Sequence, residues 1–466
     1  MSTAEKLGEF ATRIDFDKAG DAVRERVRWI VADTIGAIAG GSAEPELRAL
    51  FRLQKGGTAF SSAESDEGAT LVGLGARTAP DMAALINGSA GTFLEMDEGN
   101  RFARGHAGIH VIPAALASCE AMGAEAKTFL TAVLSGYEVC SRIAAASQLR
   151  ASMHPHGTWG TIGAAVACGR AAQLPADRMP ELIGIASSLM TATSKQTMLE
   201  GGLVRNVYAG LANRQGMLAL QLLQAGFTAE KDGLRSMFAS VISEHFDEGA
   251  LLATLPAGGS PDAQTVWHVM QNYFKLHSCC RFNHAVLDAI DDLDTRGLLP
   301  AAGDVGRVAV ETYSLAAELS DPAPRNTLAA KFSVPFAVAT RLVNGSSGVD
   351  SFTWKAVRDP AVLALAARVT VREDPAMTRR LPRERPAKVS VRLRDGSEVT
   401  AEVSFNRGDD ASPYTQGELR QKFIDLTSRV WPREHCHRVL EATLTLGGAG
   451  ESMRVWRDLL RHPYTM

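Results

Sequence analysis

The chain has 466 residues, of which 45% are apolar and 22% charged, and its formal net charge is -3 at pH 7. A chain so close to neutral has no general attraction for nucleic acid or an anionic membrane surface, and no apolar run approaches the ~20 residues that a membrane-spanning helix needs. The length allows a large core and two or three domains.

The N-terminus is charged and lacks the apolar core of a secretory signal peptide. The six cysteines are scattered and form no C-x-x-C motif, which favours a reducing compartment over a disulfide framework. We therefore expect a soluble, cytoplasmic protein that binds neither nucleic acid nor a membrane.

Residues 1–268 are expected to be mainly helical, because apolar residues recur at three- and four-residue steps, as in Val23, Val27 and Ile30. Glycine and alanine are dense in this part of the chain, which allows helices to approach each other closely. The run Gly-Thr-Ile-Gly-Ala-Ala-Val-Ala-Cys-Gly-Arg-Ala-Ala, which starts at Gly160, predicts a central helix that is buried on all sides.

The pattern changes after residue 268. Residues 307–313 and 368–372 alternate as strands do, and Asp395-Gly396 between two further alternating runs predicts a β-hairpin. Helical periodicity covers 283–294 and 331–343 and returns from 416 to about 460. The prediction is a mainly α fold with an α+β part: a large all-helical domain at 1–268, an inserted α+β lid domain at 269–408, and C-terminal helices at 409–466 that return to the helical domain.

Residues 96–113 carry a high density of ionisable groups between two apolar helical runs. The segment contains two carboxylates, two arginines and two histidines: Asp97, Glu98, Arg101, Arg104, His106 and His110. Burying so many ionisable groups is unfavourable unless they pair with each other or bind something. The segment therefore indicates either a site or a solvated loop.

A second polar stretch, residues 153–160, contains His154 and leads into the small-residue helix. A helix N-terminus offers free backbone N–H groups and a positive dipole end, which suit a carboxylate ligand. The alternative is that Thr158 or His156 only caps the helix. Further along, Arg205 lies among apolar residues and glycines, where an arginine is either paired structurally or holds an anion.

A third polar stretch, residues 273–284, falls at the proposed domain junction, where clefts form. Lys275 and Arg281 are candidate cations for an anionic substrate, whereas the two adjacent cysteines just before Arg281 are by default structural. Tyr313 stands at a predicted strand end, where a tyrosine is more often a packing residue than a chemical one.

Metal and nucleotide sites have little support in the sequence. His106 and His110 are spaced as zinc ligands on one helix face, but Gly105 and Gly108 weaken a helix there, and no carboxylate or cysteine stands at a standard companion spacing. No G-x-G-x-x-G follows a predicted strand, and there is no Walker-type loop. We therefore expect no metal and no nucleotide cofactor.

Taken in order, these stretches resemble the MmgE/PrpD family, which includes 2-methylcitrate dehydratases, cis-aconitate decarboxylases and iminodisuccinate epimerases. The resemblance covers nearly the whole chain. The similar stretches are Asp97 with Arg104-Gly-His106 and Pro113-Ala-Ala-Leu-Ala, Gly136-Tyr-Glu, the His154-Pro loop with its small-residue helix, Gly226-Phe-Thr, and Lys331-Phe-Ser-Val-Pro-Phe. Each stretch is weak alone, and their common order makes the resemblance specific.

The resemblance implies a large helical domain with an inserted α+β lid, a homodimer, and an active site between the domains that needs no cofactor. The positions that match the family's catalytic residues are Asp97, His106, His154 and Lys275. Substrate contacts are implied for Arg205, where many members have lysine, for Cys280, which is histidine in the decarboxylase, and more loosely for Tyr313.

The chain departs from the family pattern at several of these positions. The usual Asp-Phe-Asp-Asp reads Glu-Met-Asp-Glu at 95–98, the proline after the histidine is Ala107, and lysine is replaced by Arg205. Because Cys280 stands where the decarboxylase has histidine, the sequence argues against decarboxylation of cis-aconitate. These departures bear on the identity of the substrate more than on the type of reaction.

The sequence thus predicts a cofactor-independent lyase that dehydrates a small hydroxy-polycarboxylate, with a di- or tricarboxylate as its partner molecule. The reaction would start by removing a proton next to a carboxylate. Arg205 and Lys275, with Arg104 or Arg281, are the expected cations that bind the carboxylates and stabilise the enediolate.

His154 or His106 is expected to supply the base and the acid, with Asp97 orienting an imidazole. The sequence alone assigns the base to neither histidine. Two alternatives stay open: an epimerase or isomerase that removes and returns the proton, and a non-catalytic carboxylate-binding protein.

Overall fold

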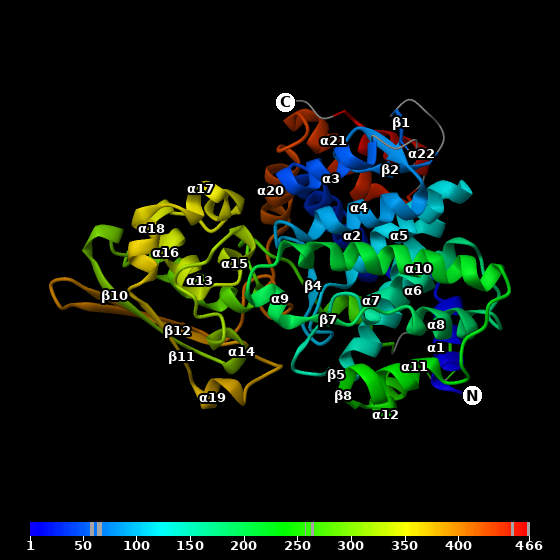
Figure 1. The fold of residues 1–466 in the computed structure, drawn as a ribbon, viewed down its shortest axis with the longest axis horizontal. Helices are drawn as coiled ribbons and strands as arrows, with labels where there is room; N and C mark the ends of the chain where they lie inside the picture. The colour runs from blue at the N-terminus through cyan, green and yellow to red at the C-terminus, as the bar shows by residue number, and fades with distance from the viewer. Residues whose placement is uncertain (56–59, 63–67, 257, 262–264, 449–451, 464–466) are drawn as a thin grey trace.

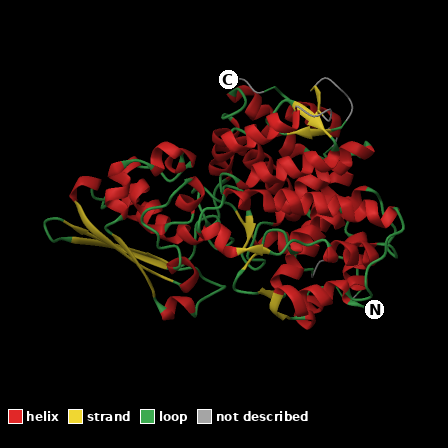
Figure 2. Ribbon diagram, in the orientation of Figure 1, coloured by secondary structure: helices red, strands yellow, loops and turns green. Residues whose placement is uncertain are grey.

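In the computed structural model the chain forms two lobes that lie side by side (Figure 1). The structure describes residues 1–55, 60–62, 68–256, 258–261, 265–448 and 452–463. The larger lobe is mainly helical, and the smaller one carries a four-stranded sheet packed against helices (Figure 2). The predicted fold class, mainly α with an α+β part, is confirmed. Among the described residues, no helix has both the length and the apolar character to cross a membrane.

The main helices of the larger lobe come from two parts of the chain. The first part supplies α1 (Thr3–Arg13), α2 (Asp21–Gly41), α4 (Pro80–Thr92), α5 (Ala107–Met122), α6 (Ala126–Ala145), α7 (Trp159–Ala171), α8 (Met179–Ser188) and α10 (Tyr208–Gln224). The second part supplies α20 (Gln416–Thr427), α21 (Arg433–Thr445) and α22 (Met453–Leu460), of which α20 and α21 pack on α2. The chain therefore leaves the larger lobe, forms the smaller one, and returns.

Helix α7 lies inside the larger lobe, as its small residues predict. Nearly all of its residues are buried, and it packs against α5, α6, α8 and α10. A Cβ atom at Gly160 would collide with the ring of His110. The glycine therefore leaves the space in which that imidazole packs against the helix.

The sheet of the smaller lobe has the strand order β11-β10-β12-β13. Its strands are β10 (Val305–Thr312), β11 (Val369–Glu373), β12 (Ala387–Leu393) and β13 (Glu398–Val403), with β10 and β11 parallel and the other pairs antiparallel. The predicted hairpin is β12–β13: Gly396 takes a φ of 93° at the turn, and the Asp395 carboxylate accepts the Ser397 N–H at 2.9 Å. The turn residues thus set the register of the two strands.

The smaller lobe's main helices are α13 (His284–Thr295), α16 (Val334–Asn344) and α18 (Pro360–Ala366). The predicted helix at 283–294 is α13. The one predicted at 331–343 is divided between α16 and a short α15 (Thr327–Lys331), because Ser333 caps α16 by accepting the Phe336 N–H at 3.0 Å.

Two short strand pairs in the larger lobe bring distant parts of the chain together. Strand β4 (Gly99–Asn100) pairs with β9 (Asn272–Tyr273), and β6 (Met153–His154) pairs with β7 (Thr193–Ser194). The paired segments include or adjoin the polar stretches singled out in the sequence. The hydrogen bonds between the paired strands satisfy backbone N–H and C=O groups of these loops, which lie outside the helices.

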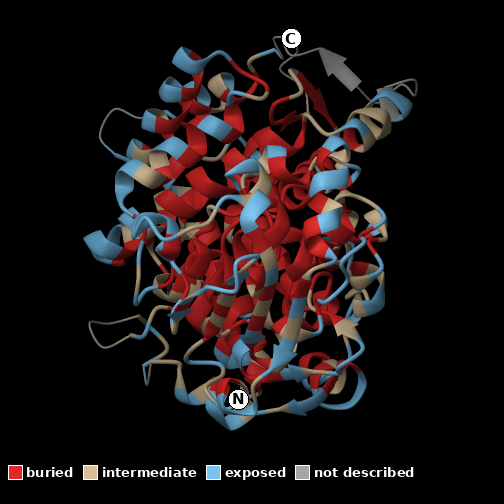
Figure 3. Ribbon diagram, turned by 90° about the vertical axis from the view of Figure 1, so that its left-hand side faces the viewer, coloured by how far each residue is buried: buried red, intermediate tan, exposed pale blue. Residues whose placement is uncertain are grey.

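Two hydrophobic cores underlie the lobes, and Figure 3 shows the buried residues enclosed by exposed ones. One core draws on residues from Leu7 to Phe274 and from Tyr414 to Leu460; the other draws on residues from Cys279 to Ala401, with Met198. Lys275 lies where the chain passes from the first core to the second. The polar site described next surrounds this crossing point.

Candidate active site

The loop between α4 and α5 is fixed by its own hydrogen bonds and by the β4–β9 pair. The Asn100 N–H donates to the Gly105 carbonyl at 2.8 Å, and β9 leads directly to Lys275. Glu95 and Arg104, near the two ends of the loop, both take a φ of 53°. That left-handed conformation is uncommon outside glycine, and residues held in it cluster at functional sites.

His106, the residue before α5, is held in one tautomer. Its Nδ1 lies 2.9 Å from the Glu98 carbonyl oxygen and 2.9 Å from Asp97 Oδ2. Only the carbonyl lies at a hydrogen-bonding angle, so Asp97 acts on the ring through its charge. Because a carbonyl oxygen only accepts, the proton is on Nδ1, and Nε2 is left as a base.

Asp97 is a buried carboxylate that stays ionised. Burial alone would raise its pKa, but the His106 ring, followed by Lys275 and Arg205, holds the pKa well below its usual range. An ionised carboxylate thus lies against the Nδ1 edge of the His106 ring.

Asp97, Glu95, Arg205 and Lys275 form one buried group of ions, here called the inner cluster. Glu95 is ion-paired with Arg205, and Lys275 Nζ lies 3.4 Å from Glu95 Oε2 and 4.0 Å from Asp97 Oδ1. Burial opposes the charge on Lys275, but Glu95 and Asp97 together raise its pKa. In the inner cluster two carboxylates thus face two cations.

His154 lies on β6, on the other side of Arg205. Its Nδ1 accepts the His156 N–H at 3.1 Å, and its Nε2 accepts the Arg205 Nε–H at 3.3 Å. Burial, and then the charge of Arg205, hold the pKa of His154 well below its usual range, so the ring is neutral. His154 thus orients the Arg205 guanidinium through its Nε2 atom.

His110 and His156 complete a group of four imidazoles with His106 and His154. The ring centroids of His156 lie 5.3 Å from His106, 4.7 Å from His110 and 4.6 Å from His154. Burial lowers the pKa of His110 to about 4, and His156 Nδ1 is buried without a hydrogen-bond partner. Within the described residues, no group of three or more histidines, cysteines or carboxylates is arranged to hold a metal ion.

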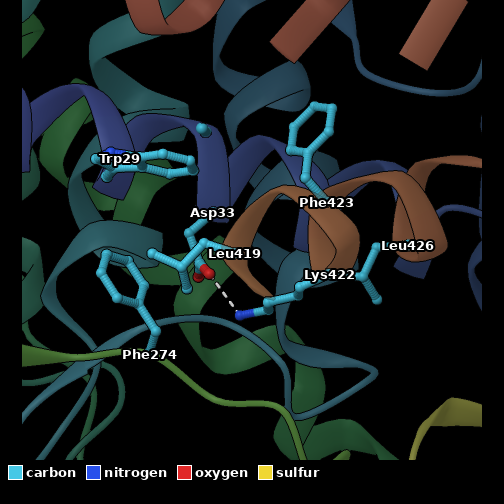
Figure 4. A pocket seen from close by; sticks show the side chains of 8 residues that line it. Trp29, Asp33, Phe274, Leu419, Lys422, Phe423 and Leu426 are labelled. Atoms are coloured by element: carbon cyan, nitrogen blue, oxygen red, sulfur yellow. Dashed lines mark hydrogen bonds and ion pairs between the residues drawn. The ribbon is translucent and has the colours of Figure 1, made fainter. Parts of the chain in front are cut away.

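Helix α20 supports the loop between α4 and α5. Lys422 of this helix is ion-paired with Asp33 of α2 (Figure 4), and it donates to the Met96 carbonyl at 2.7 Å. Trp29 and Phe274 line a small cavity beside this ion pair. The returning C-terminal segment thus fixes the backbone next to Asp97, although it supplies no side chain to the inner cluster.

Glu98, next to Asp97, is a buried carboxyl group of the opposite kind. It accepts the Gly108 N–H at 2.7 Å and the Tyr137 hydroxyl at 3.1 Å. Burial outweighs these bonds and raises its pKa to about 8, so Glu98 is protonated at neutral pH. Two adjacent carboxyl groups therefore have opposite protonation states, set by their surroundings.

Arg281 is placed near the inner cluster but is already paired. It donates to Asp409 at 2.8 Å and to the Arg407 carbonyl at 2.9 Å, and its guanidinium lies 4.4 Å from the centre of the Tyr273 ring. These contacts join the crossing point of the chain to the segment after β13. The expected role of Arg281 as a substrate cation therefore gains no support from the geometry.

Cys280 and Tyr313 belong to the smaller lobe, and the Cys280 thiol lies within range of the charges of Glu95, Lys275 and Arg205. Burial raises the pKa of this thiol to about 11, so the sulfur is protonated at neutral pH. Tyr313 is fully buried, its ring lies 5.9 Å from that of Phe282, and its hydroxyl has no hydrogen-bond partner among the described residues. A buried hydroxyl without a partner is unfavourable unless a ligand satisfies it.

Two arginines, here called the outer arginine pair, lie beyond the Tyr273 ring. Arg104 is exposed, whereas Arg385 is 6% exposed and lies over the rings of Tyr273 and Phe282, 5.9 Å from each centroid. Burial, followed by the charge of Arg385, lowers the pKa of Arg104. Neither arginine has an ion pair with a carboxylate within the described part of the chain.

The structure thus brings Asp97, His106, His154, Lys275 and Arg205 together, with Cys280 close to them on the smaller lobe. Sequence reasoning missed Glu95 and Arg385. Glu95 belongs to the acidic block that marked its segment and could have been found there. Arg385 stands in the basic stretch 379–385, where nothing in the sequence distinguishes one arginine from the next.

Comparison with known proteins relates this chain to a protein family. The MmgE/PrpD N-terminal domain model matches residues 5–245, and the MmgE/PrpD C-terminal domain model matches residues 277–446. Cis-aconitate decarboxylase of Aspergillus terreus is 24% identical over 469 residues, which cover 95% of this chain and 92% of the relative. Proteins of the same name from Mus musculus and Homo sapiens are 25% and 26% identical, over 79% and 89% of this chain and 75% and 86% of the relatives.

Proposed function

Because the chain belongs to the MmgE/PrpD family, we propose that it is a lyase that acts on a small polycarboxylate. The names of its relatives, cis-aconitate decarboxylases, support a lyase whose substrate is a carboxylic acid. The observation that carries the proposal is the fixed tautomer of His106. Its basic Nε2 is available beside two buried cations, which is the combination that proton removal next to a carboxylate requires.

In the proposed reaction His106 Nε2 removes a proton from the carbon next to a substrate carboxylate. Lys275 and Arg205 stabilise the negative charge that develops on the carboxylate oxygens as the enediolate forms. Asp97 stabilises the imidazolium that results, since its carboxylate lies 2.9 Å from Nδ1.

The same histidine completes the elimination. The proton that His106 took from carbon passes from its Nε2 to the substrate hydroxyl as the carbon–oxygen bond breaks, so the products are water and an alkene and His106 is neutral again. His154 Nε2 accepts the Arg205 Nε–H at 3.3 Å and so orients the guanidinium that binds the substrate carboxylate. These contacts support His106 as base and acid and His154 as the residue that positions Arg205.

We favour dehydration over decarboxylation. Cys280, which by the family resemblance stands where the decarboxylase has a histidine, has its pKa raised by burial to about 11 and is a poor proton carrier at neutral pH. Epimerisation is the second candidate, because the enediolate formed by proton removal could take a proton back on its other face instead of losing the hydroxyl. Product analysis separates the two: loss of water indicates dehydration, and inversion alone indicates epimerisation.

The test is hydrogen exchange at carbon. The protein is incubated in deuterated water with citrate, malate or cis-aconitate, and the C–H signals are followed by NMR. We expect exchange or turnover with at least one acid, and a loss of ~100- to 10,000-fold in His106→Gln. His437→Gln, at an exposed position on α21, is the matched control and should leave the rate unchanged.

Exchange that persists in His106→Gln would remove this histidine from the mechanism. Binding of the acids without exchange or turnover would instead favour a non-catalytic carboxylate-binding protein. We also propose a homodimer, as the family resemblance implies. Light scattering on the purified protein would distinguish a monomer from a dimer by its molar mass.

A further inference from the structure

The charges of the inner cluster leave an open question about the substrate. Glu95 and Asp97 already pair with Arg205 and Lys275, so the cluster holds no cation in excess. A di- or tricarboxylate brings two or three negative charges. Part of that charge must therefore be met by cations outside the inner cluster.

Arg385 is the best placed of these cations. It is 6% exposed, and among the described residues its guanidinium donates one hydrogen bond, to the Arg101 carbonyl at 3.4 Å. Stacking over Tyr273 and Phe282 holds the guanidinium but does not neutralise it. Among the described residues no carboxylate pairs with it, and a buried charge without a counter-charge is costly.

The surroundings of Arg385 point to an anion at this place. Tyr273, on which it lies, has its ring 6.4 Å from that of His106, so the guanidinium is one side chain away from the base. Phe282, its other ring, contacts Tyr313, whose buried hydroxyl has no partner. Arg104, also without a carboxylate partner in the described part of the chain, approaches from the larger lobe.

We propose that Arg385, Arg104 and the Tyr313 hydroxyl form a second carboxylate-binding subsite, which selects substrates with a carboxylate remote from the reacting carbon. This subsite rests on the proposed function and adds the reason why a monocarboxylate is a poor ligand. Arginine suits the role because its planar fork binds both oxygens of a carboxylate.

The subsite also joins the two lobes. Arg104 belongs to the loop between α4 and α5, whereas Arg385 and Tyr313 belong to the smaller lobe, just before β12 and just after β10. Burial, followed by the charge of Arg385, lowers the pKa of Arg104, and a carboxylate bound between the arginines relieves the repulsion between them. Binding of the remote carboxylate therefore stabilises the contact between the lobes around the reacting carbon.

The test compares two acids that differ by one carboxylate. Malate and 3-hydroxybutyrate share the hydroxyl and the acidic C–H, but 3-hydroxybutyrate has a methyl group in place of the remote carboxylate. Calorimetric Kd values are measured for both acids with the wild-type chain, Arg385→Gln and Arg383→Gln. Arg383 is exposed two residues away and is the matched control.

We expect the wild-type chain to prefer malate, and Arg385→Gln to weaken malate binding ~10- to 100-fold with little effect on 3-hydroxybutyrate. Arg385→Lys, which keeps the charge and loses the fork, should recover part of the loss. Arg383→Gln should bind like wild type. Equal losses for both acids, or an unchanged preference in Arg385→Gln, would show that Arg385 is a packing residue and overturn the subsite.

Tyr313→Phe tests the subsite independently, in case the arginine variants fail to fold. Because the hydroxyl has no partner among the described residues, its removal should not lower the Tm, yet it should weaken malate binding selectively. A wild-type chain that fails to prefer malate or citrate over 3-hydroxybutyrate also overturns the subsite. A wild-type chain that prefers malate but exchanges no C–H in deuterated water upholds the subsite and overturns the proposed chemistry.

Discussion

The inner cluster and the outer arginine pair treat charge in opposite ways. In the inner cluster, Glu95 and Asp97 hold Arg205 and Lys275, and every charge has a partner at or within 4.0 Å. In the outer pair, Arg104 and Arg385 face each other, with no carboxylate bound to either in the described residues. The inner cluster is neutral overall, which suits proton transfer, whereas the outer arginine pair carries an uncompensated positive charge, which suits binding of an anion. Within one site, the first group thus serves catalysis and the second serves substrate recognition.

The largest effect is expected from removing His154, which binds Arg205 of the inner cluster. His154→Ala should lower turnover ~100- to 1,000-fold, because Arg205 loses the contact that positions it against the substrate carboxylate. The fold should stay intact, which circular dichroism and the Tm would check. Activity close to wild type in a folded variant would exclude His154 from the mechanism and weaken the assignment of chemistry to this side.

Breaking the neutrality of the inner cluster should cost stability. Glu95→Gln leaves Arg205 and Lys275 buried with one carboxylate fewer, and losing one partner of a buried ion pair typically costs ~3–5 kcal/mol. Urea unfolding of the variant measures the change. Glu311→Gln, at the exposed ion pair with Lys388 in the smaller lobe, is the control and should cost less than ~1 kcal/mol.

If Glu95→Gln unfolds at the same urea concentration as wild type, the cations of the inner cluster do not depend on their carboxylates. The contrast with the outer arginine pair would then be lost, because that pair already exists without such partners.

A smaller effect is expected from the pH dependence that Glu98 introduces. Its pKa is raised from 4.5 to about 8 in the folded protein, so the native state holds a proton that the unfolded chain releases. The stabilising contribution of Glu98 is full below pH 4.5 and is lost as the pH rises to about 8, at up to ~1.4 kcal/mol per pH unit.

Glu98→Gln keeps the shape of the protonated carboxyl group and should flatten the decline in Tm between pH 5 and 8. Asp97 cannot produce this decline, since its pKa is lowered and its contribution disappears only on acidification. An identical slope in wild type and variant would mean that Glu98 is ionised in the native protein.

Much of the fold follows from local patterns in the sequence. The period of the apolar residues predicts the helices, and Asp395-Gly396 predicts the hairpin of β12 and β13, because both depend on residues that are close in the chain. The start of α16 at Val334 was missed by three residues. The N-cap at Ser333 sets this start, although the apolar periodicity that predicts the helix continues through the capping residue.

The candidate site could be predicted in part for the same reason. Asp97, His106 and His154 stand in polar stretches that are conspicuous within apolar surroundings. Arg281 belongs to such a stretch too, yet it is ion-paired with Asp409, which is more than a hundred residues away in the sequence. No pattern in the sequence around Arg385 distinguishes it, and its importance comes only from the side chains on which it packs.

The sequence by itself determined the mainly helical fold, the polar segments and the residue types that proton abstraction requires. Tertiary structure alone decided which charges are already neutralised, which histidine nitrogen carries a proton, and which arginines remain for a ligand. The physical reason is that periodicity and capping act over a few residues. Charge pairing, burial and tautomer choice depend on side chains brought together by β4–β9, β6–β7 and the contact between the two lobes.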